Sequence, residues 1–246
     1  MHPIVISSIV AKSGIPDIQE IKKIGRGKIL IEAKSATAAN RLVDNPAFTK
    51  PNLKAFIPAF RVLREGVIQD VPTELQLDYI RRNIKFPGIK ILEIFRFNRR
   101  ITINNKSEYV PSRIHRIKFA GQVLPRVVFL FKTRHEVRPF IPKSRICFKC
   151  YRAGHVAKVC KGSPRCLYCG NNVHNEEEPC KGAEVDVFCI NCKGSHLSTS
   201  KECPVVSRQD NIIKLAAIEN ISIADARRII GDQSGSSSRY ANILNS

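Results

Sequence analysis

All nine cysteines of this chain lie between residues 147 and 203, together with three of its six histidines. They form three consecutive sets with the spacings C-x2-C-x4-H-x4-C, C-x2-C-x4-H-x5-C and C-x2-C-x3-H-x6-C. The sets are Cys147, Cys150, His155 and Cys160; Cys166, Cys169, His174 and Cys180; and Cys189, Cys192, His196 and Cys203. No cysteine is left over, so every thiol has a place in one repeated pattern.

Three thiolates and one imidazole are a standard tetrahedral ligand set for structural zinc. A loop of about fourteen residues is too short to bury a core, so the metal would supply its folding free energy. Gly154, just before the histidine of the first set, eases a tight turn there. The alternatives are disulfides or scattered free thiols, and an odd number of cysteines fits a closed disulfide framework badly. The sequence therefore predicts three Zn²⁺ ions in closed sites.

Zinc modules of this size, called zinc knuckles, bind single-stranded nucleic acid. Apolar residues beside the ligands offer a surface for a stacked base, and basic residues around them can meet phosphates. The predicted nucleic-acid contacts are Phe148, Lys149, Arg152, Val156, Lys158, Lys161, Arg165 and Tyr168, with Leu167 and Ile190 as further apolar candidates. For Phe148 the alternative role is to fill the small interior of the first knuckle.

The second knuckle differs from the first because three glutamates, residues 176–178, lie beside its ligands. Their negative charge repels phosphate. We therefore expect the second knuckle to contribute less to RNA affinity than the first, and to act as a spacer or as a contact for a protein partner.

The charge of the chain is strongly positive, with 41 Lys and Arg against 21 Asp and Glu. Residues 61–146 alone carry a net charge of +12, more than solubility requires. A polyanionic partner is expected, with nucleic acid first and an acidic membrane surface second. No apolar run approaches the ~20 residues of a membrane span, and no signal peptide is evident. Zinc-binding thiols favour a reducing compartment, the cytoplasm or the nucleus.

The N-terminal residues 1–60 predict a strand, a helix and a second strand. Residues 28–33 read as a strand, Ser35 as the cap of a helix that runs to Val43, and residues 53–57 as a strand that stops at Pro58. This order resembles the back half of an RNA-recognition-motif (RRM) fold, so residues 1–60 are predicted to form a partial RRM-like unit. Residues 1–20 give no clear pattern.

Residues 61–138 predict a second unit with the order β-α-β-β-β. Strands are expected at residues 62–68, 91–97, 114–119 and 126–133, with a hairpin loop at 98–111. A helix is expected to begin at Thr73, with Gln76 completing a capping box. The unit resembles an RRM (ferredoxin-like) fold whose second helix is missing or reduced.

The RNA-binding signature of the RRM is absent from residues 28–31 and 127–131. Base stacking on the sheet is therefore not assumed, and Phe95 and Phe97 are expected to belong to the core. His115 and His135 are expected to be surface or strand histidines rather than ligands.

The predicted fold class is α+β, a degenerate RRM-like region followed by three knuckles and a C-terminal helical segment. A basic linker, residues 139–146, leads into knuckles at 147–160, 166–180 and 189–203. Residues 205–231 predict two helices, the second capped by Ser222 and ended by Gly231, which dock on the third knuckle or mediate self-association. Residues 232–246, rich in Ser, Gly and Asn, are expected to be disordered.

Several motifs of the C-terminal part recur together in one known family. They are residues 124–131, Pro139, Pro142, residues 147–150, Gly154, His155, residues 165–170 and residues 203–204. With these motifs the chain resembles the gag-like proteins of insect non-LTR retrotransposons of the jockey type. This resemblance implies three CCHC knuckles, binding of element RNA, self-association into ribonucleoprotein particles and nucleic-acid chaperone activity. Such proteins usually carry a longer polar N-terminal extension, so the chain is expected to be a truncated copy, a fragment or a host gene derived from the element.

Three functions follow as hypotheses. The first is a binding protein for RNA or single-stranded DNA that packages retroelement RNA, without a small-molecule substrate or a membrane. The second is a host adaptor in RNA processing whose knuckles contact proteins. The third, an enzyme, is not expected, because no Walker-type loop, catalytic carboxylate pair or HExxH motif is present and every cysteine is assigned to zinc.

Overall fold

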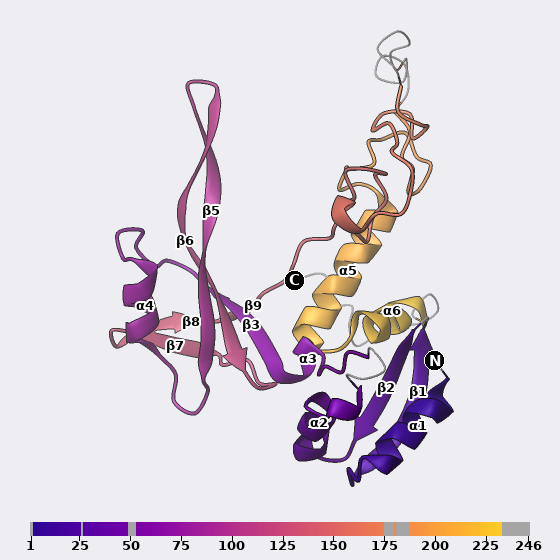
Figure 1. The fold of residues 1–246 in the computed structure, drawn as a ribbon. Coiled ribbons are helices and arrows are strands. Elements are labelled where there is room, and N and C mark those ends of the chain that lie inside the picture. The colour runs from indigo at the N-terminus through magenta and orange to yellow at the C-terminus, as the bar shows by residue number, and fades with distance from the viewer. Residues whose placement is uncertain (1, 26, 49–52, 175–179, 181–186, 233–246) are drawn as a thin grey trace. The chain divides into compact units, whose positions relative to one another are not determined.

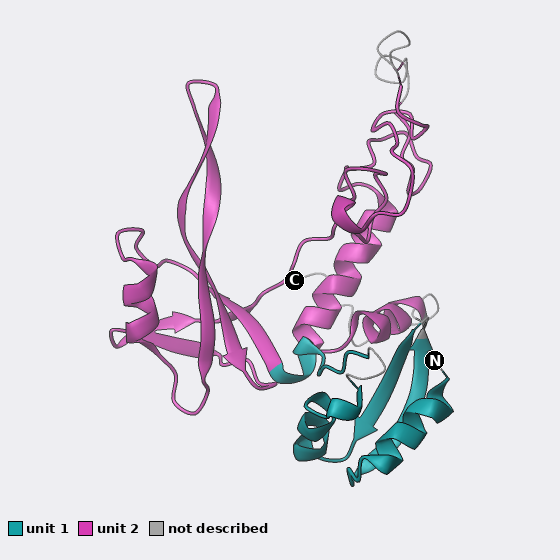
Figure 2. Cartoon of the chain, viewed as in Figure 1, with its two compact units in different colours: residues 1–62 teal, residues 63–246 magenta. Residues whose placement is uncertain are grey.

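The computed structural model describes residues 2–25, 27–48, 53–174, 180 and 187–232. The chain is α+β, with antiparallel sheets in its first 140 residues and the Cys/His sets in its C-terminal half. It divides into two compact units, residues 1–62 and residues 63–246 (Figure 2). Each unit is described here by itself.

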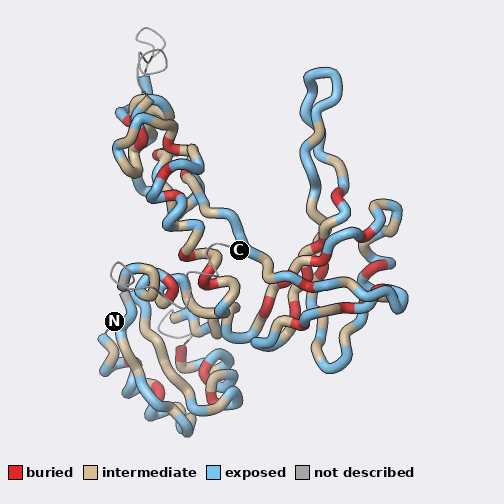
Figure 3. Tube along the Cα trace, turned by 180° about the vertical axis from the view of Figure 1, so that it is seen from behind, coloured by how far each residue is buried: buried red, intermediate tan, exposed pale blue. Residues whose placement is uncertain are grey.

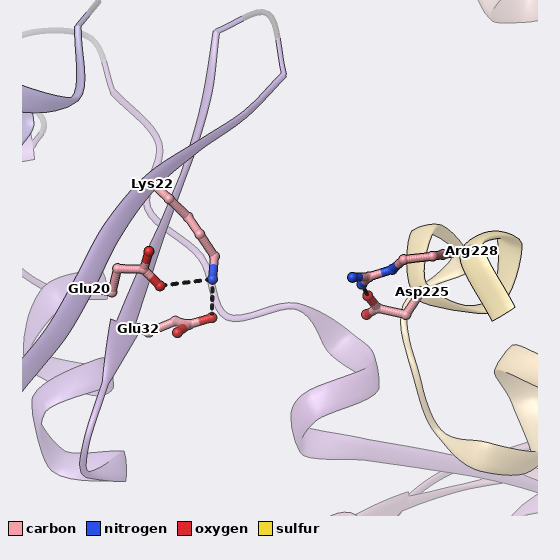
Figure 4. Close-up of polar contacts among 5 residues, drawn as sticks. All are labelled: Glu20, Lys22, Glu32, Asp225 and Arg228. Atoms are coloured by element: carbon pink, nitrogen blue, oxygen red, sulfur yellow. Dashed lines mark hydrogen bonds and ion pairs between the residues drawn. The ribbon is translucent and has the colours of Figure 1, made fainter. Parts of the chain in front are cut away.

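The first unit packs two helices against a hairpin (Figure 1). Its elements are α1 (Pro3–Lys12), β1 (Ile18–Gly25), β2 (Lys28–Ala33), α2 (Ala36–Val43), the 3-10 turn η1 (Pro46–Phe48) and the short α3 (Ala59–Val62). Ile6, Val10, Leu42 and Phe48 form its buried core. On the hairpin, the ammonium of Lys22 lies 2.9 Å from a carboxylate oxygen of Glu20 and 3.0 Å from one of Glu32 (Figure 4).

Three predictions for this unit have clear outcomes. The strand at residues 28–33 is confirmed as β2, and Ser35 caps α2 by accepting a hydrogen bond from the amide of Ala38 at 3.2 Å. The predicted strand at residues 53–57 is wrong, because these residues form no regular secondary structure. The side chain of Leu53 packs against the core. The sequence pattern did not predict α1, in which Ile6 and Val10 are the buried residues.

The second unit contains a four-stranded and a three-stranded antiparallel sheet among its described residues. The first has the order β5-β6-β3-β9 and the second β4-β7-β8. The elements are β3 (Leu63–Ile68), α4 (Leu77–Asn83), β4 (Ile84–Lys85), β5 (Ile91–Ile103), β6 (Lys106–Ala120), β7 (Val127–Leu130), β8 (Thr133–Glu136) and β9 (Arg138–Pro139). The core includes the fully buried Ile68, Ile80, Ile117, Phe119 and Val128.

The predicted hairpin loop at residues 98–111 is instead a continuous two-stranded ribbon. β5 and β6 stay paired from Ile91 opposite Phe119 to Ile103 opposite Lys106. The turn itself consists of Asn104 and Asn105, both with positive φ, which suits a tight two-residue hairpin. Most side chains of the ribbon are exposed (Figure 3), so its polar sequence reflects solvent on both faces rather than a loop.

The predicted strand at residues 126–133 is shorter than expected: β7 ends at Leu130, and Thr133 already begins β8. Phe131 and Lys132 both have positive φ and turn the chain between β7 and β8. Apolar composition continued through this turn, so hydrophobic periodicity alone did not reveal it.

The capping box predicted for Thr73 and Gln76 is wrong. α4 begins at Leu77 with Gln76 as its N-cap residue, and no side chain caps it. The segment before the helix is held instead by the guanidinium of Arg96 on β5. This group donates to the carbonyl of Thr73 at 2.9 Å and also to the carbonyl of Leu75. A distant strand therefore binds the carbonyl groups of this segment, while the amide groups of the first turn of α4 receive no side-chain cap.

His115 is a strand residue, as expected, but it is fully buried rather than on the surface. Its Nε2 accepts a hydrogen bond of 3.0 Å from Nε of Arg96, and its buried Nδ1 has no hydrogen-bond partner. Burial, with the positive charge of Arg96 and the influence of His135, lowers the pKa of His115 to about 4. His115 is therefore neutral at physiological pH.

Phe95 and Phe97 were expected in the core, and this is wrong. Ile94 is buried on the core side of β5, whereas Phe95 and Phe97 are only half-buried and do not belong to the core cluster. The ring of Phe95 lies under the guanidinium of Arg116, and the ring of Phe97 stacks on that of Phe140. These aromatic residues cover the other face of the sheet.

The C-terminal helices are α5 (Pro204–Glu219) and α6 (Ile223–Asp232). Ser222 caps α6, as predicted, by accepting from the amide of Asp225 at 3.0 Å, and Asp225 pairs with Arg228 (Figure 4). Gly231 lies inside α6 rather than ending it. The two helices share the buried residues Ile212, Leu215, Ala216 and Ala226. The predicted disorder of residues 232–246 falls, apart from Asp232, outside the described residues.

Candidate metal centres

The first Cys/His set is built on a short β-turn. Ile146 and Ala153 form an isolated antiparallel bridge, and the amide of Cys147 donates to the carbonyl of Arg152 at 3.0 Å. This turn directs the thiols of Cys147 and Cys150 toward the same point. The 3-10 turn η2 (Ala157–Val159) then returns the chain so that the thiol of Cys160 reaches this point too.

Gly154 has the backbone geometry that the sequence predicted. Its φ is +107°, in a region that residues with a Cβ rarely adopt, and its amide donates to the carbonyl of Arg145 at 2.7 Å. A Cβ at this position would meet nothing within 4 Å. The glycine is therefore required by the backbone conformation and not by crowding.

The second set repeats the turn of the first. Arg165 and Asn172 form the bridge, and Cys166 donates its amide to the carbonyl of Asn171 at 2.8 Å. Sγ of Cys169 lies 3.1 Å from Nε2 of His174. Glu176, Glu177 and Glu178, on which the weaker role of this set depends, lie outside the described residues.

The third set is the most buried, with Cys189 and Cys203 fully enclosed. Sγ of Cys192 lies 3.0 Å from Nε2 of His196. Nδ1 of His196 lies 2.9 Å from the carbonyl of Leu197, which fixes this nitrogen as the N–H donor and leaves Nε2 free to bind a metal. Lys193, with φ of 67°, provides the left-handed turn residue of this set.

The donor atoms of each set lie within 4.8 Å of one another. The thiols of Cys166 and Cys180 lie 3.5 Å apart, and those of Cys189 and Cys203 lie 3.6 Å apart. Tetrahedral zinc with sulfur and nitrogen ligands holds its donors about 3.5–3.8 Å apart. Within the described part of the chain no disulfide joins two cysteines, which contradicts the disulfide alternative. Each set could therefore hold one metal ion, and its soft donors fit zinc.

The local backbone favours the thiolate at the first cysteine of each set, whereas the pKa of Cys150 and of Cys203 is raised, chiefly by burial. Burial raises the pKa of Cys189, but amide hydrogen bonds from Cys192 and Asn191 and contacts with neighbouring thiols outweigh it and lower that pKa to about 7. The balance is similar at Cys147 and Cys166, where the pKa is also lowered. Such thiols deprotonate readily when a metal arrives.

The first and third sets pack together. The side-chain amide of Asn191 accepts from the amide of Ala153 and donates to the carbonyl of Tyr151, both at 3.0 Å. Cys189 and Cys203 are buried with Val206 from the first turn of α5, against Ile146, Ala153 and Cys192. The helical segment thus contacts the third set, one of its two predicted roles. The sequence showed no sign that Asn191 joins two sets.

Some of the predicted nucleic-acid contacts line a hollow beside the first set, and the others lie outside it. Arg152, Lys161 and Arg165 line a hollow of about 330 Å³ against the first set. Phe148, Val156 and Tyr168 do not line it. Phe148 is 74% exposed, which contradicts a role as an interior plug. The remaining predicted contacts, Lys149 and Lys158, are exposed beside the first set. The hollow also includes Val159 and Ser163, which the sequence interpretation had not selected.

The comparisons with known proteins are limited in extent. No family model matches the chain. Over 80 residues it is 30% identical to the "Nucleic-acid-binding protein from mobile element jockey" of Drosophila funebris. That match covers 32% of this chain and 13% of the relative. No solved structure matches. Among the helices in the described ranges, none is long and apolar enough to cross a bilayer.

Proposed function

We propose that this chain is a zinc-dependent protein that binds single-stranded RNA or DNA through its knuckles. The relative from Drosophila funebris, a nucleic-acid-binding protein of a jockey mobile element, supports the class. The three convergent Cys/His sets support the zinc. The proposed cofactors are three Zn²⁺ ions, one in each set, whose role is to fold the knuckles.

The hollow beside the first set is the observation that carries this proposal. Arg152, Lys161 and Arg165 bring three positive charges to its rim, and Val159 adds an apolar surface. Phosphates bind at such cations, and a base can stack on an apolar surface between them. Because bases are available for stacking only when unpaired, this chemistry favours single strands.

The finer proposal is a gag-like role, in which the protein packages the RNA of a retroelement into ribonucleoprotein particles and acts as a nucleic-acid chaperone. Self-association belongs to this proposal. The RRM-like interpretation of residues 61–138 also remains a proposal, supported by an antiparallel sheet with the order β5-β6-β3-β9. The role is one of binding and not catalysis. Zinc thiolates favour the reducing cytoplasm or nucleus as its location.

The test combines zinc stoichiometry with RNA binding on the purified protein. About three zinc ions per chain are expected. Fluorescence anisotropy should show tighter binding to single-stranded than to double-stranded RNA, with the preference weakened after chelation. Arg152→Ala with Lys161→Ala should weaken binding, whereas Lys12→Ala with Lys54→Ala, two exposed residues of the first unit, is the charge-matched control. Three zinc ions with RNA affinity unchanged by chelation would move RNA binding to the basic region and favour a protein-adaptor role for the knuckles.

A further inference from the structure

Among the described residues, the hydrophobic core of the second unit packs on one face of the four-stranded sheet and leaves the other face outside the core cluster. The pairing of β3, β5 and β6 directs Ile68, Ile94, Ile117 and Phe119 toward the core. The alternate residues therefore point to the opposite face, since successive side chains of a strand point to opposite sides. These residues are half-buried and carry aromatic and charged groups.

Three phenyl rings gather on this face. Phe97 from β5 and Phe140, just after β9, stack with ring centres 5.9 Å apart and planes inclined by 29°. Phe95 lies beside them, and the guanidinium of Arg116 is 4.7 Å from its ring centre and 4.9 Å from that of Phe140. The residues that form this face, called here the aromatic face, are Phe95, Phe97, Arg116, Lys118 and Phe140.

Both cations of the aromatic face are held by acidic neighbours. Arg116 lies 3.7 Å from Glu65, and Lys118 lies 2.8 Å from Glu93. The side chains of Arg116 and Lys118 are each still about a quarter exposed. The ion pairs orient these cations over the rings, and the exposed part of each cation remains accessible to a phosphate.

We infer that the aromatic face is a second nucleic-acid-binding surface that stacks unpaired bases, an inference that rests on the proposed function. Base–aromatic stacking is tolerant of sequence because every base has a π face. Guanidinium groups stack on bases as well as on phenyl rings. The surrounding residues 61–146 carry a net charge of +12, which attracts the phosphate backbone to this part of the chain.

The chain also ties this face closely to the first knuckle. Six residues lie between Phe140 and Cys147, so the extended chain spans at most about 25 Å between them. A single strand of about 4–16 nucleotides is the usual site size of one single-strand-binding fold. One strand can therefore occupy both surfaces, and binding at one raises the local concentration at the other.

The test uses the full chain loaded with zinc and a short fluorescent oligouridine. In Phe97→Leu/Phe140→Leu the apolar volume is largely kept and the stacking surface is lost, so the Kd should rise roughly five- to tenfold. The slope of log Kd against log salt should stay the same, because no phosphate contact is removed. Phe129→Leu is the matched control, since Phe129 is an exposed phenylalanine on β7. Its Kd should equal that of the wild type.

The outcomes separate this inference from the proposed function. If the wild type fails to bind RNA, the proposed function is wrong. If the wild type binds and the double variant, with unchanged melting temperature and zinc content, binds equally well, the aromatic face is only a packing feature of the sheet. Crosslinking of the wild type to 4-thiouridine RNA decides the case even when the variant unfolds. Peptides with Phe97 or Phe140 are expected among the products, and crosslinks confined to residues 147–203 would overturn the inference.

Discussion

At the scale of single residues, Arg96 is the most connected side chain in the sheet of the second unit. Its guanidinium donates to carbonyl groups before α4 and to the ring of buried His115. Since Nε2 of His115 accepts this hydrogen bond, the ring must be neutral and carry its proton on Nδ1. Protonation of Nε2 would set two positive groups against each other in a buried site. This pair therefore links the stability of the unit to pH.

The first prediction concerns this link. The pKa of His115 falls from its usual value near 6.5 to about 4 on folding, so the unfolded chain binds more protons between these values. The contribution of His115 to the free energy of unfolding should be fully present well above pH 6.5 and fall by about 3 kcal/mol as the pH drops toward 4. His115→Gln, which can still accept from Arg96, should lose this part of the pH dependence. Urea unfolding of both proteins from pH 7 to 4.5 measures it, and parallel curves would contradict it.

Gly154 gives a second prediction at the same scale. Gly154→Ala places a Cβ on a backbone with φ of +107°, a strain on the order of 1–3 kcal/mol. The zinc affinity of the first set should fall roughly tenfold in a competition titration with a chelator, followed through the NMR signals of His155. Gly162→Ala is the control, because its φ is ordinary and its Cβ would make only ordinary contacts at 3.8 Å. Equal losses in both variants would show that the strain argument is wrong.

At the scale of elements, the first and third sets pack against each other and against the start of α5, so they are not independent modules. The side-chain amide of Asn191 uses both its oxygen and its nitrogen to bridge them. Val206 extends the same small core into the helix. A set that binds metal therefore stabilises the surface on which its neighbour packs, and the two sites are coupled through folding.

The third prediction tests this bridge. Asn191→Ala removes both hydrogen bonds and should cost about 1–3 kcal/mol of local stability. In hydrogen exchange, the amide of Ala153 should lose protection by roughly tenfold or more, although it lies in a different set. Asn171→Ala is the control, since the side chain of Asn171 is exposed. If Ala153 keeps its protection in Asn191→Ala, the two sets are joined by other contacts.

At the scale of the whole molecule, the basic charge and the knuckles have different proposed roles. Lys and Arg exceed Asp and Glu by 20 over the chain, and most of the excess precedes the first set. Attraction to phosphates is long-range and insensitive to sequence, whereas stacking at the zinc sets requires folded knuckles and unpaired bases. Salt and chelation should therefore affect different components of binding.

The fourth prediction separates these components. Raising the salt from about 50 to 200 mM should weaken RNA binding by a factor on the order of 10³ or more if 6 or more phosphates are contacted. After zinc removal the protein should still bind RNA with a strong salt dependence, and its preference for single strands should fall to the part that the aromatic face supplies. Anisotropy titrations across salt with single- and double-stranded RNA measure both. A preference for single strands that chelation leaves undiminished would assign it to the sheet and not to the knuckles.

The sequence by itself determined the three Cys/His sets, because four ligands must lie close along the chain when a loop is too short to have a core of its own. It also determined local features such as β2 and the caps at Ser35 and Ser222. Each of the two caps bonds an amide only three residues away. The tertiary structure decided what depends on distant partners. Arg96 binds the carbonyl groups of the segment before α4, Asn191 joins two sets, and Phe97 stacks on Phe140. Strand pairing decides which face of the sheet a side chain occupies, and a one-residue change in register reverses the face. For this reason Phe95 and Phe97, which were expected in the core, lie on the opposite face.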